Sequence, residues 1–148
     1  MIHIAHGEGF SVMAHANGAA TVRAAAEAGV DSVEHGAYLD AAALRAMAAH
    51  GTAWTPTLAT IGNLLGCGRY PDAVLEPLLE GQQRNLRAFA AMGGIIAPGS
   101  DAGAYLVPHV QGAADEMRYL KAALGADADA LLTRSAAEIR RRFKPNAL

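Results

Sequence analysis

Two histidines and one aspartate stand just after short apolar segments, at points where a parallel sheet would gather them. His15 follows the run SVMA, His35 follows VDSVE, and Asp101 follows GIIAP in the stretch APGSDAG. In parallel α/β folds, functional side chains collect at the carboxyl ends of the strands. Imidazoles and carboxylates are ligands that zinc, iron or manganese accept in hydrolytic sites. The three residues therefore predict a metal site. The alternative interpretation is a pair of hydrogen-bonded structural histidines and an aspartate that caps local amides.

The elements that position these residues alternate between strands and helices. Short runs rich in Val, Ile and Thr predict strands, whereas Ala-rich amphipathic stretches predict helices. Gly29 and Gly51 are expected to end two helices. Asn17 and Asp40 are expected to cap the helices that follow them. The expected strands are Ser11–Ala14, Val30–Glu34, Thr52–Leu58 and Gly94–Pro98; the expected helices are Ala19–Ala28, Ala41–His50, Asp72 to about Met92, Gly112–Leu124 and Asp129–Phe143, with a loop over Ile61–Tyr70.

This alternation predicts a parallel sheet with helical crossovers, and so an α/β fold. The first three strands start about twenty residues apart, a spacing typical of barrel units. A complete eight-unit (β/α)8 barrel needs about 250 residues, whereas the 148 residues present have room for four units. We expect one domain over residues 1–148, formed as part of a TIM-type barrel or as a small open sheet.

Composition excludes several function classes. The chain is 52% apolar and 18% charged with a net charge of -2, which gives no basic field to hold nucleic acid. The cluster Arg140, Arg141, Arg142 and Lys144 ends a predicted helix, where cations complement the helix dipole. The single cysteine, Cys67, precludes an internal disulfide. We see no leader or membrane span and expect a cytoplasmic protein.

The ordered motifs AHA, EHG and GSDAG resemble the amidohydrolase superfamily, and most closely its branch of imidazolonepropionases and Xaa-Pro dipeptidases. Residues Ala5–Leu58 are similar to the fifth to seventh barrel strands of that family. The stretch GGIIAPGSDAG resembles its eighth strand, and EMRYLKAALGADADALL resembles the helices that follow. The resemblance covers most of the chain and implies that it corresponds to strands five to eight.

The resemblance also implies roles for the three residues. His15 and His35 would bind one divalent metal, with zinc expected, and Asp101 would contact it and carry a proton from the attacking water. The activity implied is hydrolysis of C–N bonds in small amides, dipeptides or cyclic amides. Three residues near strand ends or in the following loops are candidates to bind substrate, and packing or solvent exposure is the alternative for each: His109, Tyr38 and Thr57.

The chain departs from the family pattern in its other metal ligands. The family carries a His-x-His pair on its first strand and a bridging lysine on its fourth. This sequence has no such pair, because His3 and His6 are spaced as on a surface helix. Its only lysines are Lys121 and Lys144, in or beyond late helices. We therefore expect at most one metal per chain and little activity alone, as in a truncated enzyme.

Two other functions stay open: a non-catalytic remnant, and a binding module whose open sheet edges recruit another chain. Four barrel units would leave two strand edges unpaired and would uncover inward-facing apolar side chains. We therefore expect a homo-oligomer, or a complex with a complementing N-terminal half. No nucleic-acid or membrane partner is expected.

Overall fold

The structure is a computed structural model that describes residues 1–143, so Lys144 of the basic cluster lies outside the described residues. It contains a three-stranded parallel sheet formed by β1 (Met13–Ala16), β2 (Ser32–His35) and β3 (Ala53–Thr55). The strands lie in the order β1-β2-β3, with Met13 opposite Ser32 and Ser32 opposite Ala53. The predicted α/β class with a parallel sheet is confirmed.

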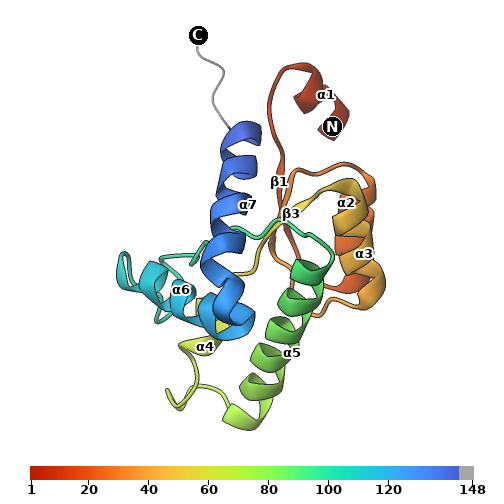
Figure 1. Ribbon diagram of the computed structural model, residues 1–148. Helices are drawn as coiled ribbons and strands as arrows, with labels where there is room; N and C mark the ends of the chain where they lie inside the picture. The colour runs from red at the N-terminus through yellow and green to blue at the C-terminus, as the bar shows by residue number, and fades with distance from the viewer. Residues whose placement is uncertain (144–148) are drawn as a thin grey trace.

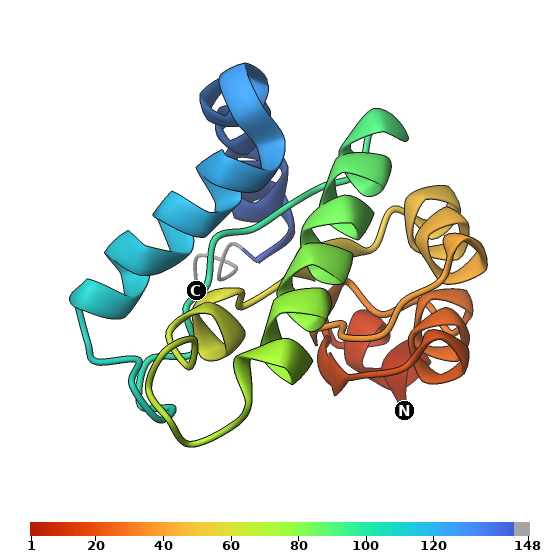
Figure 2. The ribbon, with the colours of Figure 1, turned by 90° about the horizontal axis from the view of Figure 1, so that it is seen from below.

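The helices of the described chain are α1 (Ile2–Gly7), α2 (Ala19–Glu27), α3 (Ala41–His50), α4 (Ala59–Gly62), α5 (Asp72–Ala91), α6 (Gln111–Leu124) and α7 (Ala128–Arg142), with a 3-10 turn at Gly125–Asp127. Four of them form two pairs on either side of α5 (Figures 1 and 2). The pair α2 and α3 lies on one side of α5, and the pair α6 and α7 lies on the other. The short helix α1 stands apart near the start of β1.

The first strand begins two residues later than the sequence predicted. Ser11 and Val12 make other bonds: Ser11 Oγ donates to the carbonyl of Arg142 at 2.7 Å, and the Val12 amide donates to Asp31 Oδ2 at 2.7 Å. Regular pairing with β2 starts only at Met13. As a result His15 lies within β1 rather than after it.

The third and fourth predicted strands are shorter than expected. The third ends at Thr55, because Pro56 has no amide to donate and Thr57 adopts a left-handed backbone with φ 50°. The fourth, Gly94–Pro98, does not form a regular strand. It touches the sheet at one bridge, where Ile96 lies beside Trp54. The prediction of a regular strand over Gly94–Pro98 is wrong, because two glycines and a proline, which are poor strand formers, bound the segment.

The helices follow the sequence more closely than the strands do. Asp40 caps α3 as predicted, with Oδ1 accepting from the Ala43 amide at 2.8 Å, and Gly51 ends that helix in the left-handed conformation. The prediction for Asn17 is wrong, because Gly18 occupies the N-cap of α2. Asn17 Oδ1 instead accepts from the amide of Ala37 in the loop after β2.

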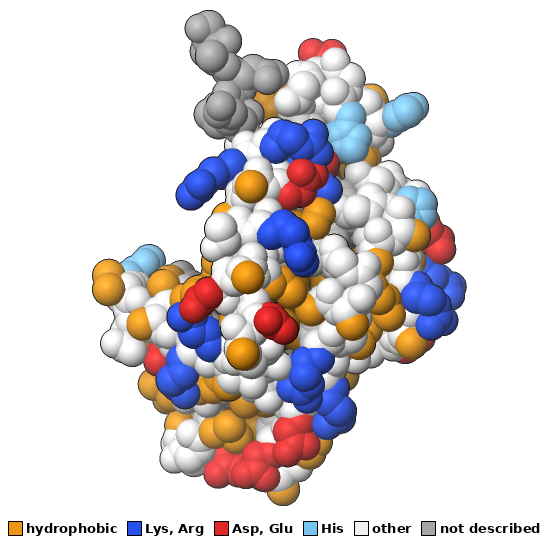
Figure 3. Space-filling view, viewed as in Figure 1, with side chains coloured by type: hydrophobic (Ala, Val, Ile, Leu, Met, Phe, Trp, Pro, Cys, Tyr) orange, Lys and Arg blue, Asp and Glu red, His pale blue; other side chains and the backbone are white. Residues whose placement is uncertain are grey.

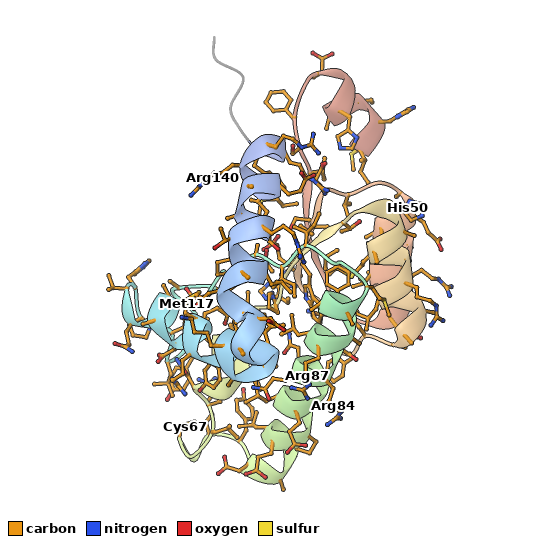
Figure 4. The ribbon with its side chains drawn as sticks, in the orientation of Figure 1. His50, Cys67, Arg84, Arg87, Met117 and Arg140 are labelled. Atoms are coloured by element: carbon orange, nitrogen blue, oxygen red, sulfur yellow. The ribbon has the colours of Figure 1, made fainter. Side chains whose placement is uncertain are left out.

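The core lies between the sheet and the helices. Val33, Trp54 and Ile96 form one row across the sheet, and all three are fully buried. Phe89 of α5 packs edge-on against Trp54 with ring centroids 5.8 Å apart. Arg87, also on α5 (labelled in Figure 4), donates to the carbonyl of Ala123 on α6 at 3.2 Å and so links α5 to the group formed by α6 and α7.

The other face of the sheet carries a polar row rather than the apolar one expected. His15, Glu34 and Thr55 lie opposite one another in the strand register. Of the side chains on this face, Met13 is the large apolar one that is exposed, at 59%. Acidic and basic side chains are interspersed over the face that carries α7 (Figure 3). Within residues 1–143, no helix is both long and apolar enough to cross a membrane.

Candidate functional site

His15 and His35 lie side by side at the carboxyl ends of two adjacent strands. The parallel register of β1 and β2 places His15 opposite Glu34 and His35 opposite Ala16, so the two histidines are diagonal neighbours. Their ring centroids are 4.3 Å apart, and the ring planes are inclined at 64°. Two imidazoles at this separation can turn their nitrogens toward one point above the strand ends.

The backbone of His35 is unusual. Its φ is 69°, in the left-handed region that a residue with a side chain seldom adopts. The ring is held by Thr57, whose Oγ1 lies 2.8 Å from His35 Nδ1. Such strained backbone tends to persist only where surrounding contacts hold it, and it is common at functional sites.

The environment of His35 favours the neutral imidazole. Burial lowers the pKa of His35 most, and the neighbouring His15 lowers it further, whereas Asp101 and Glu34 oppose these effects. The neutral ring is the form that offers a lone pair to a metal or accepts a proton. The environment of His35 therefore favours the form of the ring that both a metal ligand and a proton acceptor require.

A hollow of about 220 Å³ opens above these residues at the strand ends. The three predicted ligands, His15, His35 and Asp101, all line it. Asp101 reaches it from the turn after the 94–98 segment and itself has a φ of 56°. Thr57, predicted to contact substrate, also belongs to this hollow. The complete lining is His15, Glu34, His35, Thr55, Thr57, Gly99 and Asp101.

Glu34 is a site residue that the sequence analysis missed. It was assigned to the strand VDSVE, and its carboxylate lies in the hollow beside the two histidines. Ser32 Oγ donates to Glu34 Oε1 at 2.6 Å, which holds the carboxylate along the strand. The sequence does contain a signal for the position of Glu34. Side chains alternate between the two faces of a strand, so Ser32 and Glu34 must share one face.

Gly99 lies where the segment that carries Asp101 comes close to the end of β3. A Cβ at this position would lie 2.4 Å from Thr55 Cγ2, too close for any side chain. The glycine therefore allows the segment that carries Asp101 to approach β3.

The residues fit part of a metal site. The two imidazoles supply a suitable pair of ligands, and the carboxylates of Glu34 and Asp101 line the same hollow. Across residues 1–143, however, no group of three or more His, Cys, Asp and Glu side chains is arranged to hold a metal ion. The chain therefore offers an incomplete ligand set.

The other predicted residues lie away from this hollow. Tyr38, 69% exposed, lines a second hollow of about 160 Å³ against α5. His109 is exposed in the loop before α6. His6, on α1, bonds Asp31 at 2.8 Å near the start of β2, the opposite end of the strands. Lys121 pairs with Asp129 at 2.9 Å rather than with the histidines.

Comparison with known sequences finds distant relatives. No family model matches the chain. An uncharacterized protein of Mycobacterium tuberculosis is 33% identical over 108 residues, which cover 69% of this chain and 29% of the relative. The chain thus spans less than a third of the curated relatives it matches.

Solved structures match nearly the whole chain. A prolidase complexed with N-methylphosphonate-L-proline is 28% identical with a TM-score of 0.73, covering 97% of this chain and 36% of that one. A crystal structure of an amidohydrolase is 26% identical with a TM-score of 0.75, covering 95% and 35%. A candidate prolidase of Bifidobacterium longum is 31% identical with a TM-score of 0.71, covering 91% and 37%.

Together, the parallel α/β fold and the histidines at its strand ends indicate a segment of a hydrolase with an α/β fold. The chain belongs to the amidohydrolase superfamily, and it spans about a third of the solved members.

Proposed function

We propose that this chain is part of a (β/α)8 barrel hydrolase that cleaves C–N bonds in small amides, dipeptides or cyclic amides. The observation that carries the proposal is the meeting of His15, His35 and Asp101 around one hollow at the carboxyl ends of parallel strands. Active sites of barrel enzymes lie at this end. The prolidase with a bound proline derivative supports a dipeptide-like substrate.

The proposed cofactor is one divalent metal, with zinc expected, held by His15 and His35 with Asp101 nearby. When bound, such a metal lowers the pKa of a coordinated water toward about 7. Asp101 would take the proton of the attacking water and pass it to the leaving nitrogen. Thr57 would hold the ring of His35, and Tyr38 and His109 would contact substrate from the loops.

We propose that the chain alone has little activity. It offers two imidazoles and the carboxylates of Glu34 and Asp101 in the hollow, without the His-x-His pair and bridging lysine typical of the family. Removing members of an interdependent catalytic unit lowers rates far more than additively. A complementing N-terminal half would supply the His-x-His pair and the lysine, whereas a second copy would add only another set of His15, His35 and Asp101.

A binding module is the second candidate function. The observation that favours it is the position of β1 at the end of the sheet order, with Met13 exposed. An unpaired strand edge can recruit another chain without any turnover.

Metal content tests the main proposal. We expect protein purified without chelator to carry at most one divalent metal per chain by elemental analysis. His15→Ala and His35→Ala should each abolish binding, because either change leaves one imidazole. His50→Ala, at the exposed end of α3, is the matched control and should retain the metal. Two tightly held metals per chain would contradict the ligand assignment.

Turnover tests the role of Asp101. Assayed with proline dipeptides, N-acyl amino acids and cyclic amides, the chain should be several orders of magnitude slower than a complete family member. Residual activity should fall further in Asp101→Asn, which cannot accept the proton, and should persist in Asp129→Asn on α7. Robust turnover in Asp101→Asn would rule out this mechanism.

A further inference from the structure

The left-handed backbone of His35 is uncommon for any residue other than glycine, and it determines how β2 ends. Its φ of 69° is followed by Gly36 at 60°, so the chain turns sharply as β2 ends. The turn releases the His35 carbonyl from the ladder of β2 and β3, whose last paired residues are Glu34 and Thr55. A buried carbonyl released in this way must find other donors.

Two side chains supply those donors. Trp54 Nε1 donates to the His35 carbonyl at 2.9 Å, and Gln82 Nε2 donates to it at 3.1 Å. Gln82 Nε2 also donates to the carbonyl of Pro56 at 2.7 Å. The amide of Gln82 therefore bridges the ends of β2 and β3 just beyond the point where Pro56 prevents the backbone ladder from continuing.

Core packing does not explain a glutamine at this position. Gln82 lies in α5, is 6% exposed, and has an Oε1 without a hydrogen-bond partner among residues 1–143. An unpaired buried oxygen destabilises a protein, whereas a methionine of similar length would fill the space without that penalty. The polar group is instead accounted for by the two carbonyls to which it donates.

We propose that Gln82 is a positioning residue for His35. By holding the His35 carbonyl it fixes the left-handed turn, and the turn aims the ring at Thr57 on one side and His15 on the other. With Nδ1 beside Thr57 Oγ1, Nε2 is the ring nitrogen left to bind a ligand. The consequence for metal affinity rests on the function proposed above, but the orientation of the ring does not.

The test compares Gln82→Met with Asn85→Leu. Both changes replace an amide on α5 by an apolar group of similar size, and Asn85 Nδ2 also donates to a backbone carbonyl, that of Leu39, at 2.8 Å. The first readout is the His35 ring in long-range 1H–15N NMR spectra of the metal-free chain at slightly alkaline pH. Wild type and Asn85→Leu should show one dominant tautomer, whereas Gln82→Met should show averaging between two.

The second readout is the affinity for cobalt, followed by its visible absorption. Changes in residues that orient a metal ligand lower affinity about 10- to 100-fold, and we expect a loss of that size in Gln82→Met alone. If Gln82→Met fails to fold, Gln82→Leu also lacks the donating nitrogen without introducing a buried carboxyl group, and it should give the same ring averaging.

His35 signals that are the same in wild type and the folded Gln82 variant would overturn the proposal. If the His35 ring signals change in Gln82→Met but the cobalt affinity does not, Gln82 has no role in metal binding. If wild type binds no cobalt, the proposed function fails, and the NMR comparison still decides whether Gln82 positions His35.

Discussion

Glu116 on α6 is a carboxyl group buried inside the protein, 1% exposed. Its Oε2 accepts from the amide of Ala59 at 2.7 Å, at the start of α4. Burial raises the pKa of Glu116 from 4.5 to about 7, and the amides of Ala59 and Leu58 oppose the increase. Because Ala59 is two residues from Thr57, this carboxyl group anchors the loop that holds His35.

Glu116 should make stability depend on pH. Its pKa is higher in the folded chain, so the folded state binds more protons than the unfolded state between about pH 4.5 and 7. The free energy of unfolding therefore falls as pH rises through this window, by on the order of 3 kcal/mol. Above about pH 7, Glu116→Gln should be more stable than wild type because it removes the buried charge. The difference should shrink toward pH 4.5.

Urea unfolding of both proteins at a series of pH values measures this difference. Glu80→Gln, at an exposed position of α5, controls for the loss of one carboxylate. A wild-type-minus-variant difference that stays constant from pH 4.5 to 8 would show that Glu116 does not titrate as its burial implies.

At the scale of elements, α3 is the helix whose ends are set by local chemistry. Asp40 Oδ1 satisfies the amide of Ala43, and Gly51 closes the helix with a φ of 66°. We expect Asp40→Ala to lower the free energy of unfolding by about 1 kcal/mol. Asp127 stands at the N-cap of α7 without a capping hydrogen bond, so Asp127→Ala should have a clearly smaller effect. Equal effects in thermal or urea unfolding would contradict the capping role.

Such local signals explain which elements the sequence could predict. The helix α3 was predicted at its observed bounds because a cap and a glycine mark them. The start of β1 depends on Asp31, nineteen residues away, which binds the Val12 amide. No local pattern reports that contact. The irregular 94–98 segment differs, because the glycines and the proline that bound it are a local signal against a regular strand.

The candidate site contains both residues that a local pattern predicts and residues whose role depends on distant contacts. His15, His35 and Asp101 were predictable, because ligand-type residues at strand ends converge in any parallel sheet. Gln82 and Glu116 act through backbone groups of other elements. On a helix, each looks like an ordinary polar residue, and its role follows only from what the fold places beside it.

At the scale of the whole molecule, the two faces of the sheet differ. One face packs Val33 and Trp54 against the helices, whereas the other presents His15 and Glu34 to the hollow. The open surface is thus largely polar in the middle of the sheet. Exposed apolar side chains in or before β1 include Ile4 (69%), Phe10 (69%) and Met13 (59%), and others lie in the loop before α6, at Tyr105, Leu106 and Val110.

We expect the open edge of β1 to drive the association of two or more copies of the chain. Among residues 1–143, β1 pairs with β2 alone, and its other backbone edge is open. We expect light scattering on fresh protein to show a dimer or larger species, with a two-fold dimer favoured if β1 of each copy pairs with the 94–98 segment of the other. Met13→Lys places a charge on the edge and should shift the protein toward monomer. Met92→Lys, at the exposed end of α5, should not. A monodisperse, cooperatively melting wild-type monomer would mean that the edge is already protected and that the part-barrel proposal is wrong.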